Sequence, residues 1–93
     1  MTARQLPIQY RVEVYVDSFV NDPEASFNST TPFLAISVGD EMEPSTWPNG
    51  QYGRDKIAKV IAVRHLIWEI ENSHIGHSLS VCVKIEEKPE WKK

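Results

Sequence analysis

The sequence predicts a single all-β domain, a small antiparallel sheet of four to five strands with two long loops that curls into a barrel-like shape. Isoleucine and valine together number 17 of the 93 residues, whereas leucine and alanine number 9. Such β-branched side chains fit strands better than helices. Two stretches also alternate between apolar and polar residues, which is the period of a strand with one buried face. A chain of this length makes one domain, residues 1–93, with loose ends expected at about 1–7 and 88–93.

The N-terminal half is expected to hold two strands separated by a long loop. From Ile8 to Val16 every second residue is apolar or aromatic, which predicts a half-buried strand over residues 8–17. Residues 18–32 are rich in Asn, Asp, Ser, Thr and Pro, which favour turns, so they are expected to form the first loop. A short apolar run then predicts a second strand over residues 33–38.

A second loop and a long β-hairpin are expected to follow. Residues 41–53 contain two prolines and two glycines, which break regular structure. Residues 56–71 are rich in β-branched side chains, and their polar positions scatter around a helical wheel, so they are expected to form a strand. Residues 72–76 then supply a turn, and residues 77–85 alternate as the partner strand. A helix over about 54–66, which would make the domain α+β, is the main alternative.

Charge and apolar patterning exclude several classes of partner. The net charge is −3, and no cluster of Lys and Arg matches the footprint of a phosphate backbone, so nucleic-acid binding is not expected. The longest apolar stretch, residues 60–70, contains Arg64 and His65 and is too short to span a bilayer, so no membrane partner is expected. The single cysteine, Cys82, and the lack of a secretory segment favour a cytoplasmic location.

Three histidines and Cys82 are the strongest candidates for chemistry, because the sequence has no nucleotide-binding loop, nucleophile elbow or zinc-finger cysteine pair. His74 and His77 flank the expected turn. If Ile70 pairs with His77, then His65 lies farther along the hairpin, opposite Cys82. Zinc needs three or four converging ligands, so no metal or other cofactor is expected. A Cys–His dyad would lack a cleft on a strand face, so no catalytic residue is assigned and an enzyme is not favoured.

The second loop carries the candidates for binding a partner protein. Trp47 and Tyr52 add apolar bulk to a loop that does not need it, and such rings are enriched at protein interfaces. With the neighbouring carboxylates they form a candidate partner-binding surface, which consists of Trp47, Tyr52, Asp40, Glu41 and Glu43. Alternatively, Trp47 plugs the open end of the sheet.

Carboxylates of both loops are a further candidate site, because they could bind a hard cation if the loops meet. They are Asp17, Asp22 and Glu24 in the first loop and Asp40, Glu41 and Glu43 in the second. Neither run has the spacing of an EF-hand, so solvated loop charges are the simpler interpretation.

The third predicted strand has more apolar side chains than one buried face can use. One side carries Val60, Ala62, Leu66, Trp68 and Ile70, and the other carries Ile57, Ile61, Val63 and Ile67. One side can pack on the core, and the other needs a cover, either the first loop or a second copy of the chain. Self-association is favoured, and the candidate residues are Ile61, Val63, Leu66, Ile67, Trp68 and Ile70.

These observations favour a non-enzymatic binding or regulatory protein that acts by protein–protein interaction, with a homodimer expected. One alternative is a small metal-dependent or acid–base enzyme that uses the loop carboxylates together with His74 and His77. Another is a small-ligand carrier with its site in the mouth of the barrel. The sequence indicates the class of interaction and names neither the partner nor the ligand.

Overall fold

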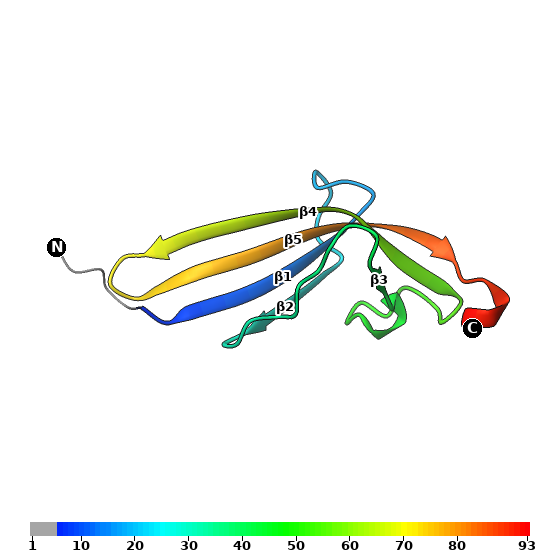
Figure 1. The fold of residues 1–93 in the computed structure, drawn as a ribbon, viewed down its shortest axis with the longest axis horizontal. Helices are drawn as coiled ribbons and strands as arrows, with labels where there is room; N and C mark the ends of the chain where they lie inside the picture. The colour runs from blue at the N-terminus through cyan, green and yellow to red at the C-terminus, as the bar shows by residue number, and fades with distance from the viewer. Residues whose placement is uncertain (1–5) are drawn as a thin grey trace.

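The computed structural model describes residues 6–93 and shows an all-β chain built on one five-stranded sheet (Figure 1). The strands are β1 (Ile8–Val16), β2 (Ala25–Ser29), β3 (Glu41–Met42), β4 (Lys56–Ile70) and β5 (His74–Glu87), and two 3-10 helices are η1 (Pro44–Thr46) and η2 (Glu90–Lys92). The strand order is β2-β1-β5-β4-β3. The sheet curls into a half-barrel, which confirms the predicted fold class. The molecule is elongated, with extents of 58 × 24 × 23 Å.

The sheet is mixed, because one of its strand pairs is parallel. The pairs β1–β2, β3–β4 and β4–β5 are antiparallel, of which the β4–β5 hairpin was expected. In contrast, β1 and β5 run parallel along nine residue pairs. A parallel pair needs a long connection between its strands, and β2, β3 and β4 all lie between β1 and β5 in the chain. The alternation of apolar and polar residues along a strand shows which face is buried but not the direction of the strand relative to its neighbours. The sequence therefore could not distinguish a parallel from an antiparallel pair.

Two segments of the N-terminal half differ from the prediction. Residues 18–32, expected to be a loop, include β2, which pairs with β1 and buries Ala25 against Val14. Residues 33–38, expected to be a strand, cross in front of the sheet without joining it. The first error arises because turn-forming side chains occupy a five-residue edge strand, and the second because strand propensity does not by itself establish backbone pairing.

The hairpin is all strand, so the helical alternative over 54–66 is wrong, but its turn begins earlier than predicted. The turn occupies residues 71–73, with Asn72 in the left-handed region at φ 58°, a conformation that asparagine tolerates. Ile70 therefore pairs with His74 and not with His77. All later pairs move with it, and His65 lies opposite Leu79 rather than opposite Cys82.

A β-bulge at Ile61 decides which side chains of β4 face the core. The register shifts between Val60, which pairs with Val83, and Ala62, which pairs with Cys82. An extra residue turns all later side chains to the opposite face. Val60 therefore shares its face with Val63 and not with the residues of even number beyond it. The two sides of this strand derived from simple alternation are thus wrong beyond the bulge.

The core lies on one face of the broad end of the sheet, which we call the inner face. Its buried apolar residues are Val12, Val14, Ala25, Trp47, Ala58, Val60, Val81 and Val83. The segments that carry β3 and η1 lie over this end, beside the C-terminal helix η2 (Figure 1). The opposite, outer face of β5 carries small residues, and Gly76, Ser78 and Ser80 are buried there.

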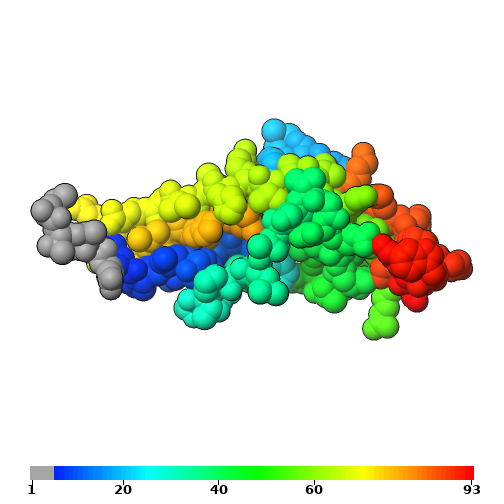
Figure 2. All heavy atoms as spheres, in the orientation of Figure 1, coloured from blue at the N-terminus to red at the C-terminus, as the bar shows by residue number. Residues whose placement is uncertain are grey.

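The narrow end of the sheet extends beyond this core, and we call it the arm: residues 8–11 of β1, 63–70 of β4 and 74–79 of β5. Figure 2 shows it as a slender projection from the bulkier end of the molecule. Its outer face is covered by side chains of the sheet itself, since the ring of Trp68 lies over Gly76. Because of this close approach, position 76 has no room for a side chain.

We expect Gly76→Ala to destabilise the chain by about 1–3 kcal/mol, because a methyl group there would overlap the Trp68 ring and force it to move. Urea unfolding at fixed protein concentration would measure the loss. Introduced into a Trp68→Ala background, the same substitution should cost much less. An equal cost in both backgrounds would show that the ring is not the cause.

Candidate functional site

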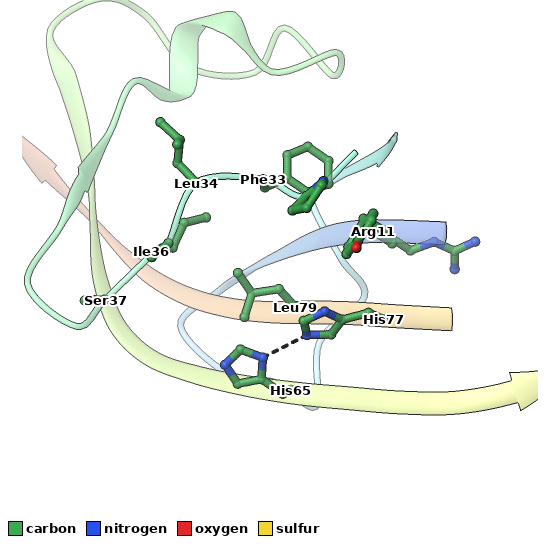
Figure 3. Close-up of a pocket in the computed structure, with 11 residues that line it drawn as sticks. Arg11, Phe33, Leu34, Ile36, Ser37, His65, His77 and Leu79 are labelled. Carbon is green, nitrogen blue, oxygen red and sulfur yellow. Dashed lines mark hydrogen bonds between the residues drawn. The ribbon is translucent and has the colours of Figure 1, made fainter. Parts of the chain in front are cut away.

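A cavity of about 420 Å³ lies between residues 32–37 and the inner face of the arm (Figure 3). Phe33 and Ile36 form the wall on the loop side, and Leu79 contributes from β5. The side chain of Arg11 points away from the other labelled residues (Figure 3), and its Nε donates a hydrogen bond to Asn28, 3.0 Å away. Apart from Ser37, the polar side chains of this cavity are on the sheet.

Two histidines form the polar part of the cavity. His65 of β4 and His77 of β5 are diagonal neighbours on the inner face, because His65 pairs with Leu79 and His77 with Ile67. Their ring atoms Nδ1 of His65 and Nε2 of His77 are 3.0 Å apart and share a hydrogen bond, and the rings stack at 26°. The ring of Tyr10 lies 6.0 Å from that of His77. Each ring has a second nitrogen, Nε2 of His65 and Nδ1 of His77, that is not part of this hydrogen bond.

The structure thus brings together a different pair of histidines from the one expected at the turn. His74 pairs with Ile70 on the outer face, and its Nδ1 shares a hydrogen bond with Ser73. The predicted register differs from the observed one by three residues, which gives each histidine different neighbours across the hairpin. Within residues 6–93, no three His, Cys, Asp or Glu side chains are grouped closely enough to hold a metal ion.

Cys82 lies in the interior of the sheet, where it is buried beside Ala62. Burial raises the pKa of its thiol, and the negative charge of Asp17 raises it further. Both effects favour the neutral thiol, whereas a nucleophilic cysteine needs an environment that favours the thiolate. The assignment of no catalytic role to Cys82 therefore remains the simplest interpretation.

Trp47 occupies the core and not an exposed recognition surface. It is only 4% exposed, and its ring meets that of Tyr52 edge to face at 5.7 Å. Its position therefore agrees with the alternative interpretation, in which Trp47 plugs the open end of the sheet. Burial raises the pKa of the Tyr52 hydroxyl, and the nearby charges of Glu24 and Asp17 raise it further. Binding of a partner at this loop stays a prediction, but the indole of Trp47 is not available to it.

The carboxylates proposed for partner binding contact the chain's own C-terminal segment. Glu43 pairs with Lys88, and Glu41 pairs with Lys92 at 2.6 Å. Hydrogen bonds from Lys88 and then Ser45 lower the pKa of Glu43. Residues 88–93, expected to be a loose end, are therefore held against the acidic loop and form η2. The other predicted loose end, 1–7, lies mostly outside the described residues.

Two of the remaining loop carboxylates, Asp40 and Glu24, are also engaged locally. Asp40 accepts a hydrogen bond from the backbone N–H of Ser37 at 2.8 Å. Glu24 accepts one from the side-chain amide of Asn49 at 2.9 Å. The two loops thus meet through a carboxylate and an amide, and no cluster of carboxylates for a hard cation forms within residues 6–93.

The residues expected to self-associate are divided between the two faces of the arm. Val63 is half-buried on the inner face, and Ile67, farther along that face, is 70% exposed. The outer-face residues Leu66, Trp68 and Ile70 are exposed, and Ile61 is the exposed bulge residue. Five of the six residues are therefore exposed and Val63 is not, the faces derived from simple alternation are wrong, and self-association stays a prediction.

Comparison of the chain with protein-family models, with curated proteins and with solved structures gives no match. Within residues 6–93 there is also no helix of the length and apolarity required to cross a membrane.

We expect Trp47→Ala to lower the free energy of unfolding by about 3–5 kcal/mol, because it opens a cavity in the core. Trp91→Ala is a matched control: Trp91 is 80% exposed, and its loss should change stability by less than about 0.5 kcal/mol. Denaturation followed by circular dichroism would compare them. Equal free energies of unfolding for the two variants would show that Trp47 does not contribute to the core.

Proposed function

We propose that this chain is a non-enzymatic binding or regulatory protein that acts by protein–protein contact, as a homodimer, and that the arm is its contact surface. The observation that supports this most directly is the exposure of four large apolar residues within five consecutive positions of β4, on both faces of the sheet. They are Leu66, Ile67, Trp68 and Ile70, all at least 40% exposed.

Leaving the apolar side chains of the arm exposed to water is unfavourable in free energy. Full burial of a Val, Leu or Ile side chain is worth about 1.5–3 kcal/mol. A small domain has only a few kcal/mol of net stability. The core of this chain lies at the other end of the sheet, and the described residues leave these four side chains exposed. Contact with another protein surface is the direct way to remove these side chains from water.

The proposal includes a cytoplasmic location. Its support is the one cysteine, which is unpaired and buried in the sheet. Proteins exposed to oxidising compartments, especially small ones, commonly use disulfides to compensate for a small core. This chain relies instead on its strand pairing and its apolar core.

We expect the purified protein to have the mass of a dimer by light scattering coupled to size exclusion at high micromolar concentration. Ile67→Lys should give a monomer, since it places a charge in the proposed contact. Val38→Lys is the matched control, because Val38 is similarly exposed, at 65% against 70%, but lies outside the arm. It should remain a dimer.

The same experiment can contradict the proposal in two ways. A strictly monomeric wild-type protein would overturn the homodimer. A dimer that persists in Ile67→Lys would remove the arm from the interface.

A small-ligand carrier is the second candidate function, and the cavity beside the histidine pair favours it. Its volume of about 420 Å³ falls in the range of small-molecule sites, and its wall is mainly apolar. The outer nitrogens of His65 and His77 could donate hydrogen bonds to an acidic group. The site therefore suits a small apolar molecule with one anionic group. The enzyme alternative has less support, because His74 is separate from the pair and the loop carboxylates have partners of their own.

We expect anilinonaphthalene sulfonate, an aromatic anion, to bind with increased fluorescence, and His77→Gln to weaken its binding by about tenfold, which corresponds to the loss of one hydrogen bond to the anion. His74→Gln is the control, because His74 does not line the cavity. Equal binding by both variants would contradict a site at the pair.

A further inference from the structure

The hydrogen bond between His65 and His77 determines how many protons the pair can offer to a ligand. Nδ1 of His65 and Nε2 of His77 are 3.0 Å apart, so one of these two nitrogens carries the shared proton and the other accepts it. A neutral pair holds one more proton, which lies on the outer nitrogen of the accepting ring. Of the two outer nitrogens, Nε2 of His65 and Nδ1 of His77, the neutral pair therefore presents one as a donor and one as an acceptor.

One additional proton changes this pattern without breaking the pair. It occupies the accepting outer nitrogen, so both outer nitrogens become donors and the hydrogen bond between the rings remains. The pair then carries a single positive charge, and a hydrogen bond from a charged donor is roughly twice as strong as a neutral one. A further proton would have to occupy the nitrogen that accepts the shared bond, which removes that bond and places two like charges side by side. The intact pair can therefore take up one proton.

Among the described residues that line the cavity, the histidine pair is the group that can bring a positive charge to a ligand. Arg11 also lines the cavity. Its guanidinium, however, points away from the other labelled residues and donates a hydrogen bond to Asn28 (Figure 3). The rest of the lining is apolar or carries hydroxyl groups. An anionic group in such a site is costly in free energy unless it has a partner charge, so its binding favours the protonated pair.

The other titratable groups around the pair leave this role to the ligand's own charge. On β1, the ring of Tyr10 lies 6.0 Å from that of His77, and a phenol cannot carry a positive charge. On β4, Glu69 shares the inner face, but it lies nearer the turn and does not line the cavity. Residues 32–37 contain no titratable side chain, and the carboxylate of Asp40 bonds to the backbone of that segment. On β5 the inner-face neighbours of the pair are apolar.

We infer that the cavity binds a small apolar anion together with one proton, which the pair formed by His65 and His77 takes up. This inference rests on the second candidate function, the small-ligand carrier, and adds the charge of its ligand and the regulation of its site by pH. The ligand class is a carboxylate or sulfonate on an apolar body. Because imidazole changes its charge between about pH 5 and pH 8, the site releases the anion as the pH rises through this range.

Linkage between the two events determines the size and the sign of the effect. The anion binds better to the protonated pair, so anion binding and proton binding strengthen each other by the same factor. Where the unliganded pair is already protonated, the affinity does not change with pH. Above that range each anion must bring a proton with it, and the dissociation constant rises by up to about tenfold per pH unit.

Two fluorescent probes that differ in the anionic group test this coupling. Anilinonaphthalene sulfonate carries a sulfonate, which stays ionised, and N-phenyl-1-naphthylamine is the same molecule without it. Between about pH 6 and about pH 9 the dissociation constant of the sulfonate should rise, by up to about tenfold per pH unit. That of the neutral probe should stay constant. Fluorescence titrations at fixed ionic strength would measure both.

Calorimetry in two buffers with different heats of ionisation counts the protons directly. At about pH 8 we expect uptake approaching about one proton for each sulfonate bound. The double variant His65→Gln with His77→Gln should show no uptake, and its binding of the neutral probe would establish that the cavity is still formed. His74→Gln and Glu69→Gln are the controls and should keep the uptake, because neither residue lines the cavity.

Each other result contradicts the inference in a different way. Sulfonate binding that does not change with pH would overturn the proton coupling and leave the carrier function intact. An equal pH dependence for both probes would show that the cavity itself changes, without a role for the anion. Proton uptake that persists in the double variant would remove the histidine pair as the group that is protonated. Failure of both probes to bind would overturn the carrier function itself, and the inference with it.

Discussion

Side chains along a strand alternate between the two faces of the sheet, and the arrangement of this molecule depends on that alternation. The bulge at Ile61 interrupts it. On the core side of the bulge, Ala58 and Val60 point inward and pack beneath Trp47. Beyond it the odd-numbered residues point inward, so His65 meets His77 across the hairpin. Without the inserted residue, Leu66 and Trp68 would take the inner face, and the two histidines would not meet there. Both the cavity and the composition of the arm's edge depend on one extra residue.

The two ends of the sheet differ in how their apolar side chains are covered. The broad end is closed by its loops, with Trp47 inserted between them and the strands. On the outer face of the arm, the small residues of β5 let Trp68 lie across Gly76, and Arg64 lies over the ring of Phe19 at 4.4 Å. These side chains shield the backbone of β5 but stay partly in water. The central strand is thereby protected on the outer face, and β4 is left as an edge.

Local signals were sufficient for the elements whose partners need no special geometry. The alternation from Ile8 to Val16 and the β-branched composition of the hairpin predicted three long strands, because burial and propensity act on each strand separately. Features that depend on a partner strand could not be predicted locally. β2 is too short and too polar to show a period of two, and residues 33–38 have strand propensity but do not pair with the sheet. Predicting the contact between His65 and His77 requires the register of the hairpin. That register could not be predicted, because several residues from 71 to 76 are equally suited to the turn.

The placement of the two ends of the described chain has a practical consequence. Pro7 continues the pairing of β1, since its carbonyl accepts a hydrogen bond from Ile75 at 2.9 Å, which sets it at the tip of the arm. The C-terminal residues are clasped to the acidic loop at the other end. A fluorophore or affinity tag fused after Lys93 would therefore stand apart from the arm by most of the length of the sheet. One fused ahead of residue 6 would emerge beside the hairpin turn, close enough to obstruct any protein that approaches there.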